Sequence, residues 1–210
     1  MLNHEIEQAV KHISKNDKVL STIIKNIGII NLRPGRQYFN ALLRSIIGQQ
    51  LSVYAAETIC NRFMNYYNNK PVPEFIISTN DLVLRNLGLS NAKVKYVKDL
   101  SQKILSKEIS LKNLSGKTDS EIIDYLTKIK GVGVWTVHMF LIFSMNRTDV
   151  LPFSDLGIRK SVMLNYGLRK LPDEKKINSI ANKNGWHPYC SVASMYLWKY
   201  LDGDFESILK

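Results

Sequence analysis

The chain has 210 residues, 45% of them hydrophobic, so it can bury one substantial core or two smaller ones. Its 29 Lys and Arg against 18 Asp and Glu give a formal net charge of +11, which favours a polyanionic partner, nucleic acid before a membrane, over a merely solvated basic surface. Residues 1–15 mix charged and apolar side chains, so we expect neither a secretory signal nor a membrane span there. Cys60 and Cys190 form no CxxC motif, which indicates a reducing compartment and excludes a four-cysteine iron–sulfur cluster.

Apolar residues recur with helical spacing along nearly the whole chain, and no stretch alternates convincingly with a period of two. In the first half of the chain, helical patterns cover residues 39–47, 55–64 after Ser52, 79–87, and 94–104 after Ser90. Serine before an apolar pattern is a typical helix cap. The sequence therefore predicts an all-α protein.

The second half of the chain continues the helical pattern. Residues 118–121 form a capping box before an apolar run that reaches Ile129, residues 137–143 are almost continuously apolar, and the last helix is expected over about 189–201. Proline and glycine interrupt the pattern at 28–35 and 146–154. We therefore expect a central lobe over residues 36–145 and a second lobe built from 1–35 and 146–210.

Residues 126–136, LTKIKGVGVWT, place a Gly-Val-Gly turn between two helical patterns. Gly131 follows the first helix, where a left-handed residue is required, and Gly133 has no side chain to keep a phosphate from its backbone N–H. Because the second helix starts there, its unpaired N–H groups attract an anion, and Lys130 adds positive charge. The segment is either a phosphate-binding hairpin or a tight helix corner without a ligand.

One acidic residue stands out downstream. Asp155 follows Pro152 and precedes an apolar helical pattern, so it is expected at a helix N-terminus. Backbone N–H groups at that position favour an anion, which can stabilise a cationic sugar as a base departs, or orient a water molecule. The residue alone is compatible with a structural cap and with a catalytic acid.

Together these segments resemble the helix-hairpin-helix (HhH-GPD) superfamily of DNA glycosylases. The resemblance rests on LTKIKGVGVWT followed by SDLGIRK. Within it, IIGQQLSVYAA from Ile46, WTVHMFLIF from Trp135 and WHPYCSVASMYLW from Trp186 are similar to the DNA-3-methyladenine glycosylases. The resemblance, which covers about residues 36 to 201, implies a two-lobed helical fold that flips the damaged base into a cleft between the lobes.

The resemblance also assigns roles to individual residues. By position these are the catalytic acid Asp155, the base-pocket residues Trp135, Met139 and Trp186, the DNA wedge residues Gln50 and Leu51, and the phosphate-binding residues Gly131, Gly133 and Lys130. The main-chain carbonyls of Thr127, Ile129 and Val132 match positions that hold a Na⁺ or K⁺ ion bridging to a DNA phosphate. No cofactor is required for catalysis. Trp198, inside the apolar pattern of the last helix, is assigned to the core.

The implied activity is hydrolytic release of alkylated purines of the 3-methyladenine type from duplex DNA. An N-alkylated purine is cationic, so an electron-rich tryptophan face attracts it, and one carboxylate facing an oxocarbenium-like sugar is sufficient. Bifunctional relatives carry a lysine two residues after the second hairpin glycine, where this chain has Trp135, so no lyase activity is expected. Cys190 stands where many relatives have arginine, which puts binding strength in doubt more than catalysis.

Two other functions stay open at this point: the same fold acting on oxidised or deaminated bases, and a non-catalytic DNA-binding module. In each case the expected partner is double-stranded DNA, bound by a monomer with no membrane association. The expected location is the cytoplasm with its nucleoid, or the nucleus in a eukaryote.

Overall fold

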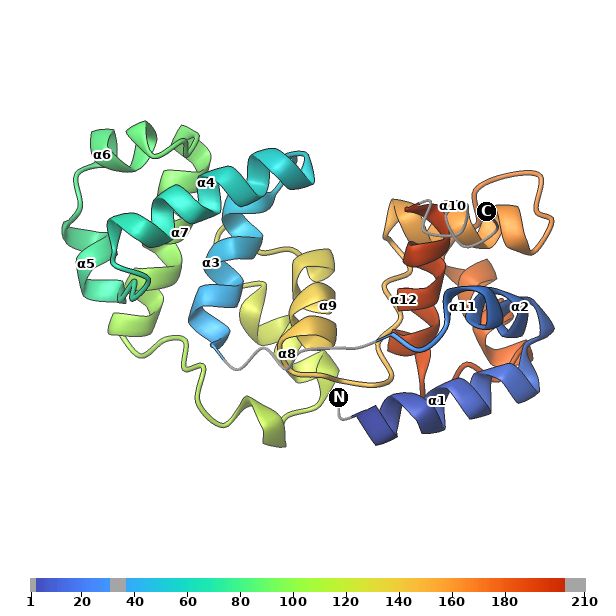
Figure 1. Ribbon diagram of the computed structural model, residues 1–210. Coiled ribbons are helices and arrows are strands. Elements are labelled where there is room, and N and C mark those ends of the chain that lie inside the picture. The colour runs from blue at the N-terminus through green and yellow to red at the C-terminus, as the bar shows by residue number, and fades with distance from the viewer. Residues whose placement is uncertain (1–2, 31–36, 203–210) are drawn as a thin grey trace. The chain divides into compact units, whose positions relative to one another are not determined.

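The computed structural model describes residues 3–30 and 37–202, and every regular element in them is helical (Figure 1). The α-helices are α1 Asn3–Asn16, α2 Lys18–Ile27, α3 Tyr38–Gly48, α4 Val53–Tyr66, α5 Pro73–Ser78, α6 Asp81–Asn86, α7 Asn91–Leu105, α8 Asp119–Leu126, α9 Val134–Phe143, α10 Leu156–Asn165, α11 Glu174–Lys183 and α12 Cys190–Leu201. A short 3₁₀ helix covers Leu114–Gly116. The prediction of an all-α protein is confirmed, and the interruption expected at Pro34 and Gly35 lies outside the described residues.

Several helices begin where their capping residues predict. The hydroxyl of Ser52 accepts a hydrogen bond from the N–H of Ala55 at the start of α4, and Ser90 does the same for α7. Thr118 and Glu121 form the reciprocal capping box at the start of α8. These bonds satisfy N–H groups that have no partner inside the helix, so the local sequence fixes where each helix starts.

Contacts divide the chain into two compact units. Unit 1 consists of Met1–Pro34 and Leu141–Lys210, and unit 2 of Gly35–Phe140. The second boundary falls inside α9 rather than after it, so the last residues of that helix pack with unit 1.

Unit 2 is organised around α3 and α7. Helix α3 packs on α4 and α7, while α5 and α6 cover α7 (Figure 1). Leu42, Leu43 and Ile46 of α3 are fully buried, as are Val97 and Leu100 of α7. This core carries the turn between α3 and α4 and the hairpin between α8 and α9.

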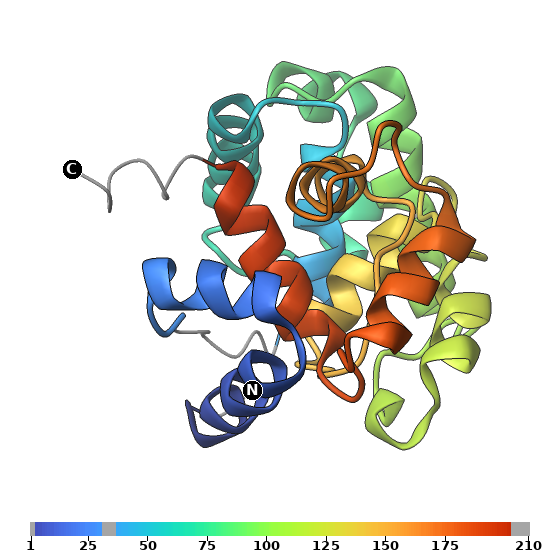
Figure 2. The same cartoon turned by 90° about the vertical axis from the view of Figure 1, so that its right-hand side faces the viewer.

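Unit 1 is organised around α12, which packs against α1, α2 and α10 (Figure 2). Every residue of α12 from Cys190 to Leu197 is buried. The hydroxyl of Tyr196 donates to the carbonyl of Gly28 at 2.9 Å, tying α12 to the end of α2. This core supports the start of α10, where Asp155 lies.

Candidate functional site

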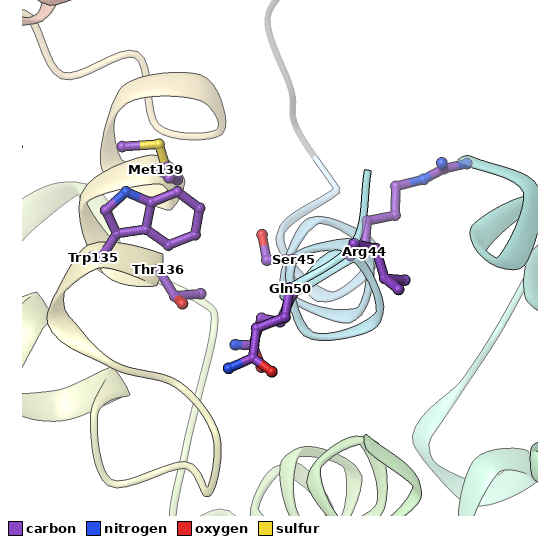
Figure 3. A pocket seen from close by; sticks show the side chains of 9 residues that line it. Arg44, Ser45, Gln50, Trp135, Thr136 and Met139 are labelled. Carbon is purple, nitrogen blue, oxygen red and sulfur yellow. The ribbon is translucent and has the colours of Figure 1, made fainter. Parts of the chain in front are cut away.

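A pocket of about 500 Å³ opens in unit 2 between α9 and the end of α3. Figure 3 shows Trp135 and Met139 of α9 on one side, with Ser45 and Gln50 on the other. Trp135 is 43% exposed. The pocket also includes Leu51, and so brings together the predicted wedge residues and two of the predicted base-pocket residues.

Helix α9 is less completely buried than its continuous apolar sequence predicts. Val137, Leu141 and Ile142 are fully buried, but Trp135 and Phe143 are 43% and 44% exposed. Trp135, Met139 and Phe143 are spaced by four residues and therefore lie along one face of the helix. The large apolar side chains on this face are only partly buried.

The turn between α3 and α4 presents the predicted wedge residues to solvent. Gln50 is exposed and has φ of +56°, a left-handed conformation that is uncommon for a residue with a side chain. Leu51 is 37% exposed, and the adjacent Val53 and Tyr54 are 85% and 83% exposed. Backbone strain of this kind is concentrated at functional sites, and here it holds a polar and several apolar side chains on a projecting turn.

Two side chains that sequence reasoning did not single out hold this turn in place. The amide of Gln49 donates to the carbonyl of Gly131 at 2.6 Å, linking the turn directly to the hairpin. The ammonium of Lys93 donates to the carbonyl of Ile47 at 2.7 Å, and partial burial lowers the pKa of this lysine. Both contacts join residues far apart in sequence, so no local pattern could have predicted them.

The two hairpin glycines have different structural requirements. Gly131 has φ of +79°, and a Cβ atom there would lie 2.2 Å from the ring of Tyr96. Gly133 lacks a positive φ, and a Cβ atom there would meet nothing within 4 Å. Gly131 is therefore required by the fold, whereas Gly133 leaves open space in front of the N-terminus of α9.

The hairpin is bonded to α7 as well as to the turn between α3 and α4. The N–H of Lys130 donates to Asp99 at 2.8 Å, while the side chain of Lys130 is 73% exposed and its ammonium lies 3.8 Å from the same carboxylate. The backbone of Lys130 is therefore held by Asp99, while its charged side chain extends into solvent.

The three carbonyls predicted to bind a monovalent cation differ in their hydrogen bonding. The Ile129 carbonyl accepts from the N–H of Val132 at 3.0 Å, while those of Thr127 and Val132 accept no backbone hydrogen bond within residues 3–30 and 37–202. Neutral carbonyl oxygens are suitable ligands for a hard cation. The donor set therefore fits Na⁺ or K⁺.

Asp155 is the N-cap of α10, as the sequence predicts. Its Oδ1 atom accepts hydrogen bonds from the N–H of Ile158 at 2.9 Å and from the indole Nε1–H of Trp198 at 2.8 Å. The carboxylate is partly exposed. Two donors on one oxygen of a partly exposed carboxylate exceed what capping requires and fix the orientation of the group.

The sequence interpretation assigned Trp198 to the core, but the structure places its indole N–H on the predicted catalytic acid. Trp198 is partly exposed, and its ring lies 5.8 Å from that of Phe143 between centroids. Gly157 makes room for this arrangement, because a Cβ atom there would lie 3.0 Å from Asp155 Oδ1 and 3.1 Å from the Trp198 ring. The spacing of apolar residues placed Trp198 on a helix but gave no sign that its N–H points at Asp155.

The predicted role of Trp186 in a base pocket is wrong. Its side chain is fully buried, and its indole N–H donates to Asp17 Oδ2 at 2.7 Å. The hydroxyl of Tyr166 donates to the same oxygen, while Oδ1 of Asp17 caps α2. Trp186 completes a buried hydrogen-bond network in unit 1, so it has no ring face to offer a ligand.

None of the helices in the described residues has the length and apolar character needed to cross a membrane.

The comparisons with known proteins converge on one family. The sequence model described as "HhH-GPD superfamily base excision DNA repair protein" matches residues 43–186. DNA-3-methyladenine glycosylase 1 of Schizosaccharomyces pombe is 35% identical over 202 residues, which cover 92% of this chain and 87% of that protein.

Solved structures show the same similarity. A 3-methyladenine DNA glycosylase of Schizosaccharomyces pombe in complex with abasic DNA has a TM-score of 0.82 at 33% identity, covering 93% of this chain and 97% of that one. A DNA-3-methyladenine glycosidase of Bacillus halodurans has a TM-score of 0.80 at 31% identity, covering 96% and 95%. The fold and the sequence therefore indicate the same relatives.

Proposed function

The chain belongs to the HhH-GPD superfamily of base excision DNA repair proteins, and we propose that it is a monofunctional DNA glycosylase that excises alkylated purines of the 3-methyladenine type from duplex DNA. The observation that carries this proposal is the partly exposed carboxylate of Asp155, oriented by Ile158 and Trp198. The names of the similar proteins supply the substrate class.

Asp155 stabilises the sugar while the base departs. Cleavage of the N-glycosidic bond leaves its electron pair on the base and positive charge on the sugar, which a nearby carboxylate stabilises electrostatically. A water oxygen then bonds to the anomeric carbon and gives up a proton, which completes hydrolysis. An alkylated purine carries positive charge before cleavage, so it leaves as a neutral base without an additional acid.

The exposed ring of Trp135 provides a stacking surface for the extruded base. A cationic purine is attracted to an indole face more strongly than a neutral one, and the thioether of Met139 adds polarisable surface beside it. Trp135 occupies the position at which bifunctional relatives have a lysine, so a Schiff base with the sugar does not form there.

The hairpin binds the DNA backbone. The open space in front of Gly133 admits a phosphate to the N–H groups at the start of α9, and the exposed ammonium of Lys130 adds attraction. A Na⁺ or K⁺ ion on the carbonyls of Thr127, Ile129 and Val132 would add positive charge at the same hairpin. Gln50 or Leu51 fills the space that the flipped base vacates, and the protein acts as a monomer.

A panel of duplexes that each contain one damaged base tests the proposal. The full chain is expected to release 3-methyladenine-type bases fastest and to leave an abasic site without cutting the strand. Faster release of an oxidised or deaminated base would show that alkylated purines are not the preferred substrates. Binding to every duplex without any abasic product would contradict the enzymatic function.

A further inference from the structure

Three potential metal ligands of different chemistry converge in unit 1. Asp149 lies between α9 and α10, His187 between α11 and α12, and Cys190 is the first residue of α12; one ligand atom from each lies within 4.8 Å of the others. His187 Nδ1 is 2.9 Å from Asp149 Oδ1 and 3.5 Å from Cys190 Sγ. Within residues 3–30 and 37–202, this is the one cluster of its kind.

Hydrogen bonds from Ser191 to both neighbours of Asp149 hold the two segments of the cluster together. The N–H of Ser191 donates to the carbonyl of Thr148 at 2.9 Å, and the N–H of Val150 donates to the hydroxyl of Ser191 at 3.0 Å. Both neighbours of Asp149 are thus bonded to the residue that follows Cys190. A site whose ligands are already placed loses little conformational entropy when an ion binds.

Hydrogen bonds of the neighbouring residues Trp186 and Tyr189 fix the position of His187. The preceding residue, Trp186, is anchored by its indole hydrogen bond to Asp17 and by a backbone hydrogen bond to Ala181 at 2.9 Å. The N–H of Tyr189 donates to the carbonyl of Trp186 at 2.7 Å, which closes the turn that carries His187. Two rigid segments therefore meet at the cluster.

The cluster is open on one side and closed on the other. The side chains of His187 and Asp149 are 48% and 37% exposed, whereas Cys190 is fully buried beneath them. Burial and the Asp149 carboxylate raise the pKa of the Cys190 thiol, which argues against a cysteine nucleophile.

We propose that Asp149, His187 and Cys190 bind one zinc(II) ion. Sulfur, nitrogen and oxygen ligands together suit this ion, and three protein ligands with one water molecule complete a tetrahedron. The zinc–sulfur bond forms as the thiol S–H bond breaks and its proton passes to solvent, with no change of oxidation state. The thiolate and the carboxylate then balance the charge of the ion.

The proposed ion links the segment between α9 and α10 to the start of α12. That segment continues from Asp149 to Asp155, so the ion would restrain the chain on which the N-cap of α10 lies. This inference concerns unit 1 alone and does not depend on the proposed glycosylase activity.

Titration of the full chain, freed of metal by a chelator, with zinc(II) and with cobalt(II) tests the proposal. We expect one ion per chain, a thiolate-to-cobalt charge-transfer absorption band, and a rise in melting temperature on adding zinc. Cys190→Ala is expected to abolish the absorption band, and Asp149→Asn to weaken binding at least about tenfold.

Cys60→Ala is the matched control, because Cys60 is the other buried free cysteine and lies in unit 2. It should bind zinc and cobalt as the wild type does. Asp149→Asn alters an exposed side chain, so it remains informative if Cys190→Ala fails to fold by circular dichroism. Absence of stoichiometric binding to the wild type, or a charge-transfer band that survives Cys190→Ala or disappears in Cys60→Ala, would overturn the proposal.

Discussion

At the scale of single residues, the environment of Asp155 differs from that of a side chain that only caps a helix. A cap needs the hydrogen bond from Ile158, but it does not need the second bond from Trp198. The glycine at position 157 leaves room for the bond between Trp198 and Asp155, since any side chain there would crowd both residues. The indole of Trp198 therefore acts as a positioning group for the carboxylate.

Trp198→Phe tests this role. The variant retains an aromatic ring beside Phe143 but removes a hydrogen bond to a charged group, an interaction that contributes about 1.5–3 kcal/mol. We expect single-turnover base release by the folded protein to fall by about tenfold or more, while DNA affinity changes little and the free energy of unfolding falls by at most about 3 kcal/mol.

Trp186→Phe is the matched control for that variant. It removes a donor to the buried Asp17 and should lower the free energy of unfolding by about 1–3 kcal/mol. Base release by the folded fraction should stay near the wild-type rate. The positioning role of Trp198 would be refuted if the two variants behaved alike.

Which tryptophan faces Asp155 could not be predicted from the sequence. The resemblance to the family placed Trp186 in the base pocket, and the apolar pattern of the last helix placed Trp198 in the core. The decisive partner of Trp186 is Asp17, which is 169 positions away in sequence. Helical spacing shows which residues share a face but not which distant carboxylate a side chain meets.

At the scale of elements, three side chains from two other elements hold the hairpin between α8 and α9. Tyr96 and Asp99 of α7 contact it from one helix, and Gln49 reaches it from the turn after α3. Its glycine pattern and the capping box of α8 were predictable because both follow from local backbone geometry. The hydrogen bond from Gln49 to the hairpin could not be predicted, because it depends on how α3 and the hairpin pack.

The two glycines give a paired prediction for this element. Gly131→Ala should lower the free energy of unfolding by about 2 kcal/mol or more, because alanine resists a positive φ and its Cβ would overlap Tyr96. Gly133→Ala should change stability by less than about 0.5 kcal/mol, yet weaken DNA binding roughly tenfold by occupying the space for a phosphate.

Thermal unfolding and equilibrium binding to an undamaged duplex measure the two effects. Equal loss of stability in both variants would contradict the distinction between a structural and a ligand-facing glycine. Unchanged binding by Gly133→Ala would contradict the phosphate site.

At the scale of the whole molecule, the net charge of +11 and the division into two units are the main features. Asp155 and Trp198 belong to unit 1, whereas Trp135, Gln50 and the hairpin glycines belong to unit 2. Fold class and helix positions followed from apolar spacing, because that spacing is a local property of the chain.

Binding to DNA should weaken steeply as salt concentration rises. Each phosphate contact contributes about −0.9 to the slope of log affinity against log salt concentration for duplex DNA. Lys130→Ala should make this slope shallower by about 0.9 and reduce affinity for damaged and undamaged duplexes alike. A loss confined to damaged DNA would contradict the assignment of Lys130 to the backbone.

The central claim is that Asp155 carries the chemistry, and single-turnover release of methylated purines from alkylated DNA tests it most directly. Asp155→Asn preserves an oxygen for the N–H of Ile158, so α10 should keep its cap while the negative charge is lost. We predict a rate at least about 100-fold below the wild type, with DNA affinity and the circular dichroism spectrum unchanged. Equal rates for the folded variant and the wild type would contradict the account.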